Sequence, residues 1–174
     1  SLRRQRQMCI RDRDTPQRPL SPYGVAKLAG GLYLDVYGAL HGLAGTTLAL
    51  ANVYGPRQDP NGEAGVVAIF AGLLLSDRPC TVFGTGEQIR DFVYVADVAD
   101  ALLAAAERAD GQLFNIGTGV GTSVNDLYRT MAAIVGGPDD PERGSARTGD
   151  LDRSVLDVTR AAGELGWRPV TGLD

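Results

Sequence analysis

Short apolar runs alternate with longer helical segments through most of the chain, and this alternation limits the fold more than any other feature. The segment 22–42 is long and apolar-rich, and the apolar run 45–51 follows it after a glycine turn. A short run of this kind is expected of a strand buried on both faces, as strands of parallel sheets are. Strands that alternate with helices favour an α/β protein with at least part of a parallel sheet.

The same patterns place the remaining elements. Capping and periodicity signals predict helices over 22–42, 65–75, 97–110, 124–135 and 159–165. Strands are expected over 45–51, 79–83, 92–95, 112–116 and 153–156. Pro and Gly clusters predict loops over 52–65 and 136–149. Asp97 stands where the third helix begins, so we interpret it as the N-cap of that helix.

Composition excludes several classes of protein. The chain has 174 residues, of which 44% are hydrophobic and 22% charged, enough for one core or two small ones. It contains no run of roughly 20 apolar residues and its start has no apolar signal segment, so we expect a cytoplasmic protein without membrane contact. Two cysteines are too few for a disulfide framework, and the single histidine, His41, offers no metal site by itself.

The first thirteen residues differ in charge from the rest. They hold five of the 17 Lys and Arg beside one acid, so residues 14–174 carry 12 basic and 20 acidic side chains, a net charge of −8. That charge opposes general nucleic-acid binding, although a basic arm is one interpretation of 1–13. We prefer another. The segment 8–12, Met-Cys-Ile-Arg-Asp, is what ATG-TGT-ATA-AGA-GAC encodes, which resembles a sequencing-library adapter end, so we expect a non-native leader over 1–13.

Tyr23 and Lys27 form the first candidate for chemistry. They stand four residues apart in the first turns of the expected helix 22–42, so their side chains share one face. A neighbouring ammonium favours the phenolate of a tyrosine, which can accept a proton, and lysine keeps donors for a ribose hydroxyl. A tyrosine packed on a helix beside a solvated lysine would give the same pattern, so the pair alone identifies no enzyme.

Five ordered segments resemble the extended short-chain dehydrogenases, the NAD-dependent epimerase/dehydratase family. The Ser-Pro-Tyr-Gly-Val-Ala-Lys of 21–27 resembles the active-site helix of that family. The others are 52–58 (Asn-Val-Tyr-Gly-Pro-Arg-Gln), 90–95 (Arg-Asp-Phe-Val-Tyr-Val), 114–119 (Phe-Asn-Ile-Gly-Thr-Gly) and 149–169, which contains Gly-Asp and Leu-Gly-Trp. The resemblance covers nearly everything from Asp14 to Asp174.

This resemblance implies a partial Rossmann-like, NAD(P)-binding α/β fold. Residues 14–62 would be the C-terminal part of the Rossmann domain with the active-site helix, and 63–174 mainly a small α/β substrate-binding domain. The glycine-rich turn 117–121 lacks the G-x-G-x-x-G spacing, so we treat it as chain geometry rather than a phosphate loop. We expect a C-terminal fragment, truncated within the small domain, with little or no catalysis by itself.

The resemblance also implies a catalytic pair and a diphosphate contact. Tyr23 and Lys27 would be catalytic and would contact the cofactor. Asn52, which follows the buried strand, would hold the diphosphate of the nucleotide sugar, because ligands of open parallel sheets bind at the carboxyl ends of the strands. The structural alternative for Asn52 is a turn-forming asparagine.

The remaining substrate contacts implied by the resemblance lie further along the chain. Arg90 and Arg147 would bind the two phosphates, since two guanidinium groups can form ion pairs with two negatively charged phosphates. Salt bridges with Asp91 and Asp150 are the structural alternative for these arginines. Val82 and Phe83 would form a wall for the base, and simple strand packing is the alternative for both. Asp150 would orient Arg147, or it would only begin the following turn.

The activity implied for the full-length parent is NAD-dependent 4-epimerisation of a UDP-hexose, because the segment 52–67 looks most like the UDP-glucose 4-epimerases. A dTDP-glucose 4,6-dehydratase and a UDP-glucuronate decarboxylase are the alternatives within the family. Ala49, Leu50 and Gly31 depart from residues common in the family, and they suggest a non-catalytic module that binds a nucleotide sugar or NAD. The family also implies a homodimer formed through the helix 22–42.

Overall fold

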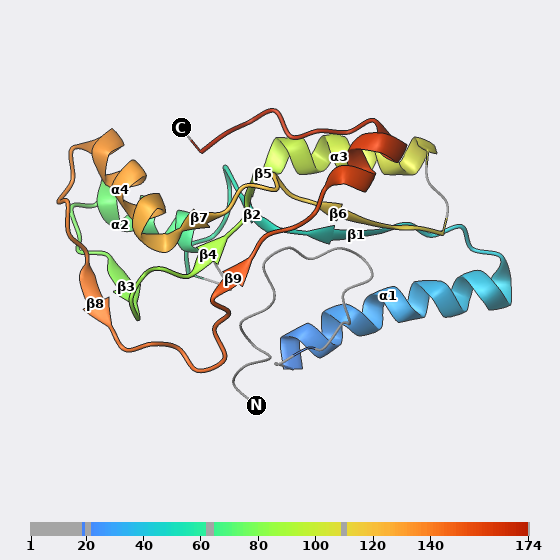
Figure 1. Ribbon diagram of the computed structural model, residues 1–174, viewed down its shortest axis with the longest axis horizontal. Helices are drawn as coiled ribbons and strands as arrows, with labels where there is room; N and C mark the ends of the chain where they lie inside the picture. The colour runs from blue at the N-terminus through green and yellow to red at the C-terminus, as the bar shows by residue number, and fades with distance from the viewer. Residues whose placement is uncertain (1–18, 20–21, 62–64, 109–110, 174) are drawn as a thin grey trace.

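The computed structural model describes residues 19, 22–61, 65–108 and 111–173 (Figure 1). The expected leader 1–13 and Ser21 lie outside the described residues. Within the described part of the chain, no helix combines the length and apolar character needed to cross a membrane.

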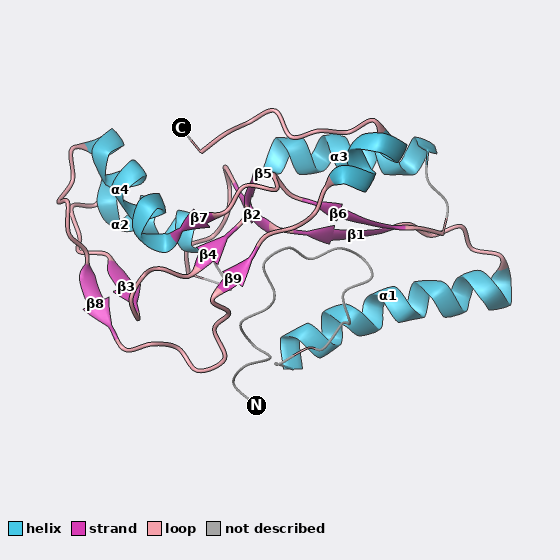
Figure 2. Cartoon of the chain, viewed as in Figure 1, coloured by secondary structure: helices cyan, strands magenta, loops and turns pink. Residues whose placement is uncertain are grey.

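The elements follow one another in an alternating order (Figure 2). The helices are α1 (Pro22–His41), α2 (Val66–Leu75), α3 (Val95–Arg108), α4 (Val124–Val135) and a π-helical turn, η2 (Ala161–Leu165). The strands are β1 (Thr47–Leu50), β2 (Asn52–Tyr54), β3 (Thr81–Phe83), β4 (Ile89–Arg90), β5 (Phe92–Tyr94), β6 (Leu113–Ile116), β7 (Thr122–Ser123), β8 (Glu142–Gly144) and β9 (Arg153–Ser154).

Most strand pairs are parallel. β1 pairs with β6 in parallel, with Thr47 opposite Leu113, and β2 pairs in the same sense with β5, with Asn52 opposite Phe92. β3 and β8 form a third parallel pair, while β4 lies between β9, which is parallel to it, and β7, which is antiparallel. The prediction of an α/β protein with parallel strands is therefore confirmed.

Helices cover both sides of the β1–β6 pair. In Figure 1, α3 and the C-terminal segment lie above these strands and α1 lies below them. The upper face is a core of buried side chains that includes Val93, Phe114, Leu165 and Trp167. On the lower face a methyl group added at Gly45 would lie 3.3 Å from the Leu34 side chain, so α1 approaches the start of β1 closely.

A second core lies under the other two helices. α2 and α4 pack together over β3, and the rings of Phe70 and Tyr128 meet edge to face with centroids 5.7 Å apart. Ser123 caps α4 because its side chain accepts a hydrogen bond from the Asp126 amide at 3.0 Å. Gly136 ends the helix in the left-handed conformation, at φ 68°, which glycine adopts at little cost. The division of the chain at residue 62 stays a prediction.

The structure departs from the expected elements at two loops, at one cap and at the two-residue strands β4 and β7, which were not expected. The expected loops 52–65 and 136–149 contain β2 and β8, three-residue strands that exist because they pair with distant segments. Interpreting Asp97 as an N-cap is wrong, since α3 already begins at Val95. Its buried carboxylate instead accepts hydrogen bonds from the amides of Val170 at 3.2 Å and Thr171 at 3.0 Å. That carboxylate fastens the end of the chain to α3.

Candidate active site

Tyr23 and Lys27 lie in the first two turns of α1. The Lys27 Nζ atom is 5.3 Å from the centre of the Tyr23 ring, and the Tyr23 side chain is 60% exposed. In Figure 1, α1 runs opposite to β1, so its first turn lies toward the end of the sheet at which β1 finishes. The pair is thus open to a ligand at the carboxyl edge of the parallel strands, with a cation beside the phenol.

Asn52 and Arg90 lie on segments that are neighbours in space. Asn52 opens β2 with an exposed side chain, and its amide donates to the Asp91 carbonyl oxygen at 2.9 Å. Arg90 closes β4 immediately before Asp91, and 15% of its side chain is exposed. The strand pairing therefore brings the two predicted substrate residues to either side of Asp91.

The Arg90 guanidinium is held by the loop that precedes β9. Its Nη1 atom donates to the carbonyl oxygens of Ile89 at 2.8 Å and Leu151 at 2.7 Å, and its Nη2 atom pairs with the Asp150 carboxylate. One salt bridge considered from the sequence is therefore present. The carboxylate predicted to orient Arg147 pairs with Arg90 instead, and Asp150 reaches Arg147 only through its amide, at 3.3 Å from the Arg147 carbonyl oxygen.

Arg147 and Phe83 form the next part of the site. The Arg147 guanidinium stacks 4.1 Å from the centre of the Phe83 ring, a cation–π contact between the loop and the end of β3. Val82 is buried, with 1% of its surface exposed, whereas Phe83 is 36% exposed. Only the backbone of Val82 can reach a ligand, while the Phe83 ring is open to one. Arg147 and Phe83 would meet such a ligand together.

Asp91 lies beside Arg90 and is hydrogen-bonded to Asn52, whereas sequence reasoning treated it only as a possible ion-pair partner. It is 1% exposed, and its carboxylate accepts hydrogen bonds from the Thr118 amide at 2.8 Å, the Thr118 hydroxyl at 2.6 Å, the Gly119 amide at 3.1 Å and the Leu156 amide at 3.3 Å. These amides serve Asp91, so the glycine-rich turn does not offer them to a phosphate. A carboxylate next to Arg90 in an apolar strand was the signal that could have revealed it.

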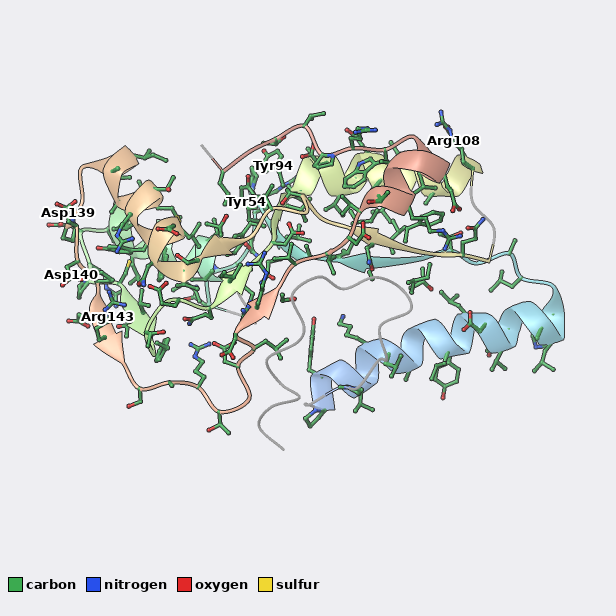
Figure 3. All side chains as sticks on the ribbon, viewed as in Figure 1. Tyr54, Tyr94, Arg108, Asp139, Asp140 and Arg143 are labelled. Carbon is green, nitrogen blue, oxygen red and sulfur yellow. The ribbon has the colours of Figure 1, made fainter. Side chains whose placement is uncertain are left out.

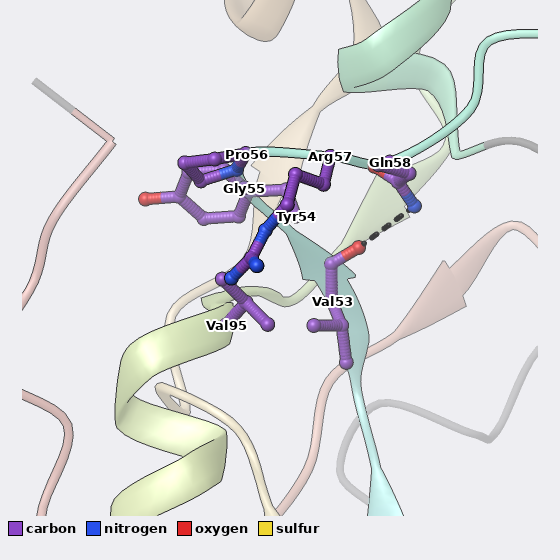
Figure 4. A pocket seen from close by; sticks show the side chains of 7 residues that line it. All are labelled: Val53, Tyr54, Gly55, Pro56, Arg57, Gln58 and Val95. Atoms are coloured by element: carbon purple, nitrogen blue, oxygen red, sulfur yellow. Dashed lines mark hydrogen bonds between the residues drawn. The ribbon is translucent and has the colours of Figure 1, made fainter.

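A pocket lies at the end of β2 (Figure 4). Gln58 closes one side, and its Nε2 atom donates to the Val53 carbonyl oxygen at 3.3 Å. Arg57 forms the rim in a left-handed conformation, with φ 71°. The pocket contains none of the predicted site residues and is lined by Val53, Tyr54, Gly55, Pro56, Arg57, Gln58 and Val95.

Two further polar groupings serve the fold. Figure 3 shows Arg143 close to Asp140 at the start of β8, with 3.6 Å between their charged atoms. Arg143 also donates to the Asn125 side-chain oxygen at 2.9 Å, which ties β8 to α4. Tyr54 and Tyr94 lie together at the start of α3, with ring centres 5.5 Å apart. Among the described residues there is no group of three or more His, Cys, Asp or Glu side chains placed to hold a metal ion.

Comparisons with known proteins agree with this arrangement. Residues 5–117 match the model of the NAD dependent epimerase/dehydratase family. A UDP-glucose 4-epimerase of Mycolicibacterium smegmatis is 52% identical over 161 residues, which are 92% of this chain and 51% of that protein. The chain thus spans about half the length of this curated relative.

Solved structures show the same similarity. The UDP-glucose 4-epimerase of Thermotoga maritima, crystallised with UDP-glucose, is 49% identical and superposes with a TM-score of 0.87 over 90% of this chain and 50% of its own. The Thermus thermophilus UDP-glucose 4-epimerase, crystallised with NAD, is 41% identical and has a TM-score of 0.87 over 95% of this chain and 54% of its own. The Rossmann-like fold of the present chain, its sequence identity to these enzymes and the match to the family model all lead to the same assignment. The chain belongs to the NAD dependent epimerase/dehydratase family.

Proposed function

We propose that the whole protein containing this chain catalyses NAD-dependent 4-epimerisation of a UDP-hexose, interconverting UDP-glucose and UDP-galactose. The observation that carries the proposal is the Tyr23–Lys27 pair, 5.3 Å apart on an open helix end, in a chain 52% identical to a UDP-glucose 4-epimerase. The residues of this chain supply the proton transfer and much of the nucleotide-sugar contact.

Tyr23 is the base and the acid of the reaction. Its phenolate removes the proton of the C4 hydroxyl as the C4 hydride leaves, which converts C4 to a ketone. The keto sugar then rotates in the site and presents its other face. Hydride returns to that face of C4, and Tyr23 gives its proton back to the C4 oxygen. The Lys27 ammonium stabilises the negative charge of the phenolate through both halves of the cycle.

The residues present fit a dinucleotide. Tyr23 and Lys27 are exposed in the first two turns of α1, on the side toward which β1 ends, and open parallel sheets bind dinucleotides at that edge. Lys27 would hold a ribose hydroxyl, since an ammonium has three donors. Bound NAD would supply the reversible hydride acceptor that the reaction requires.

The substrate diphosphate would lie between Asn52, Arg90 and Arg147. Asn52 offers an exposed amide, and Arg90 is fixed by two carbonyl oxygens and Asp150, so its fork is oriented before a ligand arrives. The Phe83 ring, with Arg147 stacked on it, would form the wall against the base, and Val82 would add its backbone. These contacts favour a nucleoside diphosphate sugar as the substrate class.

A homodimer is part of the same proposal. α1 has no buried residue among its twenty, yet it carries large exposed apolar side chains. Five of these side chains lie on its second half: Leu32, Tyr33, Val36, Tyr37 and Leu40. An exposed apolar stripe of this kind favours association with a second copy through α1.

Incubation of the whole protein with UDP-galactose tests the function. We expect UDP-glucose to form without loss of water or carbon dioxide. Parallel incubations with dTDP-glucose and UDP-glucuronate test the alternatives. Loss of water from dTDP-glucose to give a 4-keto-6-deoxy sugar would identify a dehydratase, and loss of carbon dioxide from UDP-glucuronate would identify a decarboxylase. Binding of UDP-galactose without any turnover would support a non-catalytic module and contradict the proposal.

A further inference from the structure

Asp91 connects the segments that carry the predicted substrate residues. Its amide donates to the Ser154 carbonyl oxygen at 3.0 Å, and its carbonyl oxygen accepts from the Asn52 amide at 2.9 Å. Its carboxylate binds the turn after β6 through Thr118 and Gly119, and the segment after β9 through Leu156. One residue therefore binds three segments that are distant from it and from one another in the sequence.

The surroundings of the carboxylate are built for it. A methyl group added at Gly117 would lie 2.5 Å from the Asp91 Oδ2 atom and 3.0 Å from the Ala51 Cβ atom, so only glycine lets the turn approach this closely. A buried carboxylate is costly unless it is fully hydrogen-bonded, and here three amides and one hydroxyl surround it.

We infer that Asp91 is a positioning residue for nucleotide-sugar binding, a role that rests on the proposed function. By fixing its own backbone and the Asn52 amide, it sets the distance between the Asn52 side chain and the Arg90 guanidinium, which flank it. Both would bind the diphosphate in the ground state and the transition state alike. Loss of Asp91 should therefore raise KM and the Kd of UDP while kcat changes little.

Asp91→Asn separates positioning from simple electrostatics. The variant removes a negative charge next to the diphosphate site, and that change alone would strengthen the binding of an anion. Its amide group would, however, present N–H donors to backbone N–H donors, since asparagine has a single accepting oxygen. Weaker UDP binding by Asp91→Asn would therefore report displaced geometry and not lost charge.

Asp97→Asn is the matched control. Asp97 is also buried, with 2% of its surface exposed, and its carboxylate also accepts hydrogen bonds from backbone amides. These amides belong to the C-terminal segment and not to the segments that carry the predicted substrate residues. The Kd of UDP, and KM and kcat for UDP-galactose, are measured for both variants of the whole protein, together with Tm. We expect both to lower Tm, and only Asp91→Asn to raise Kd and KM, by about tenfold, the order expected for displaced charge-assisted hydrogen bonds.

Equal UDP affinity in the two variants, or unchanged affinity in Asp91→Asn, overturns the inference. If Asp91→Asn does not fold, Thr118→Val decides, because it keeps Asp91 and removes the hydroxyl that donates to Asp91 at 2.6 Å and accepts from the Val120 amide at 3.1 Å. Weaker UDP binding by Thr118→Val, restored by Thr118→Ser, supports positioning, whereas wild-type affinity contradicts it. If the wild type binds UDP without converting UDP-galactose, the proposed function fails. The UDP affinities of the variants then still decide whether Asp91 positions the binding residues. A wild type that does not bind UDP overturns both.

Discussion

At the scale of single residues, the phenol of Tyr23 is the group on which the proposed reaction depends. Replacing Tyr23 by Phe in the whole protein removes the proton acceptor and should lower kcat by roughly 10²–10⁴-fold, the usual contribution of general acid–base catalysis. Binding of UDP should persist, since the proposed diphosphate contacts, Asn52, Arg90 and Arg147, are other residues. Steady-state rates and UDP titration measure the two effects.

Tyr33→Phe is the control for that substitution. Tyr33 lies on the same helix and is 67% exposed, but it stands outside the predicted catalytic pair. Its loss should leave epimerisation unchanged. A Tyr23→Phe enzyme as fast as Tyr33→Phe would refute the catalytic role of Tyr23.

Arg90 should not be replaceable by lysine. Its fork contacts two carbonyl oxygens and the Asp150 carboxylate, and a lysine has one nitrogen for the same partners. We expect Arg90→Lys to raise KM for UDP-galactose by about tenfold, the cost of losing one charge-assisted hydrogen bond. Arg129→Lys, which alters an exposed ion pair on α4, should leave KM unchanged. Equal KM values for the two variants would argue against a substrate role for Arg90.

Two of the residues that sequence reasoning misjudged, Asp91 and Asp97, are buried carboxylates. The motif around Arg90 could be recognised from sequence, but the partners of Asp91 and Asp97 come from segments that lie 27 to 74 residues away. An acidic residue before a helix also resembles a cap, and only tertiary contacts reveal that Asp97 holds Val170 and Thr171. Local patterns contain no information about such distant partners.

At the scale of elements, Tyr128 fastens α4 to the segment that follows it. Its hydroxyl donates to the Pro138 carbonyl oxygen at 2.7 Å, so Tyr128→Phe should cost about 1 kcal/mol of stability. Burial, followed by the nearby Cys80, Asp140 and Asp139, raises the pKa of Tyr128. The folded chain then keeps a proton that the unfolded chain loses above about pH 10, so stability falls as pH rises.

Thermal unfolding of the whole protein between pH 9 and pH 11, a range set around the ordinary tyrosine pKa of about 10, checks this sign. The wild type should lose Tm more steeply than Tyr128→Phe, which has no phenolic proton to lose. Replacing the exposed Tyr37 by Phe should leave the steep loss in place. Parallel curves for the wild type and Tyr128→Phe would show that burial of this phenol has no pH-dependent effect.

Long elements could be predicted closely from the sequence, and so could the short strands β3, β5, β6 and β9, whereas other short strands could not. α4 was expected over 124–135 and spans Val124–Val135, because a Ser cap, an apolar period and a terminal glycine mark it locally. β2 and β8 were predicted as loops, since Pro and Gly surround them and their pairing partners are remote. A strand of three residues owes its existence to its neighbour, so local pattern gives it little signal.

At the scale of the whole molecule, the exposed apolar face of α1 predicts that two copies of the protein associate as a dimer. Tyr33 and Leu40 are 67% and 70% exposed and lie about two helical turns apart on this element. Burying such side chains against a second copy would stabilise a dimer by roughly 1.5–3 kcal/mol for each large side chain that becomes fully buried. A charge introduced at both positions would have to be desolvated in the interface, which is strongly unfavourable.

The double variant Tyr33→Glu with Leu40→Glu should therefore sediment as a monomer under conditions in which the wild-type whole protein is a dimer. Leu103→Glu provides the comparison, because Leu103 is 65% exposed on α3, and its replacement adds charge to a different helix. We expect Leu103→Glu to remain dimeric. Dissociation by Leu103→Glu, or a dimer that survives the two α1 substitutions, would place the interface elsewhere. The stripe on α1 would then have to be covered by another part of the whole protein, because an apolar surface of this extent is seldom left in water.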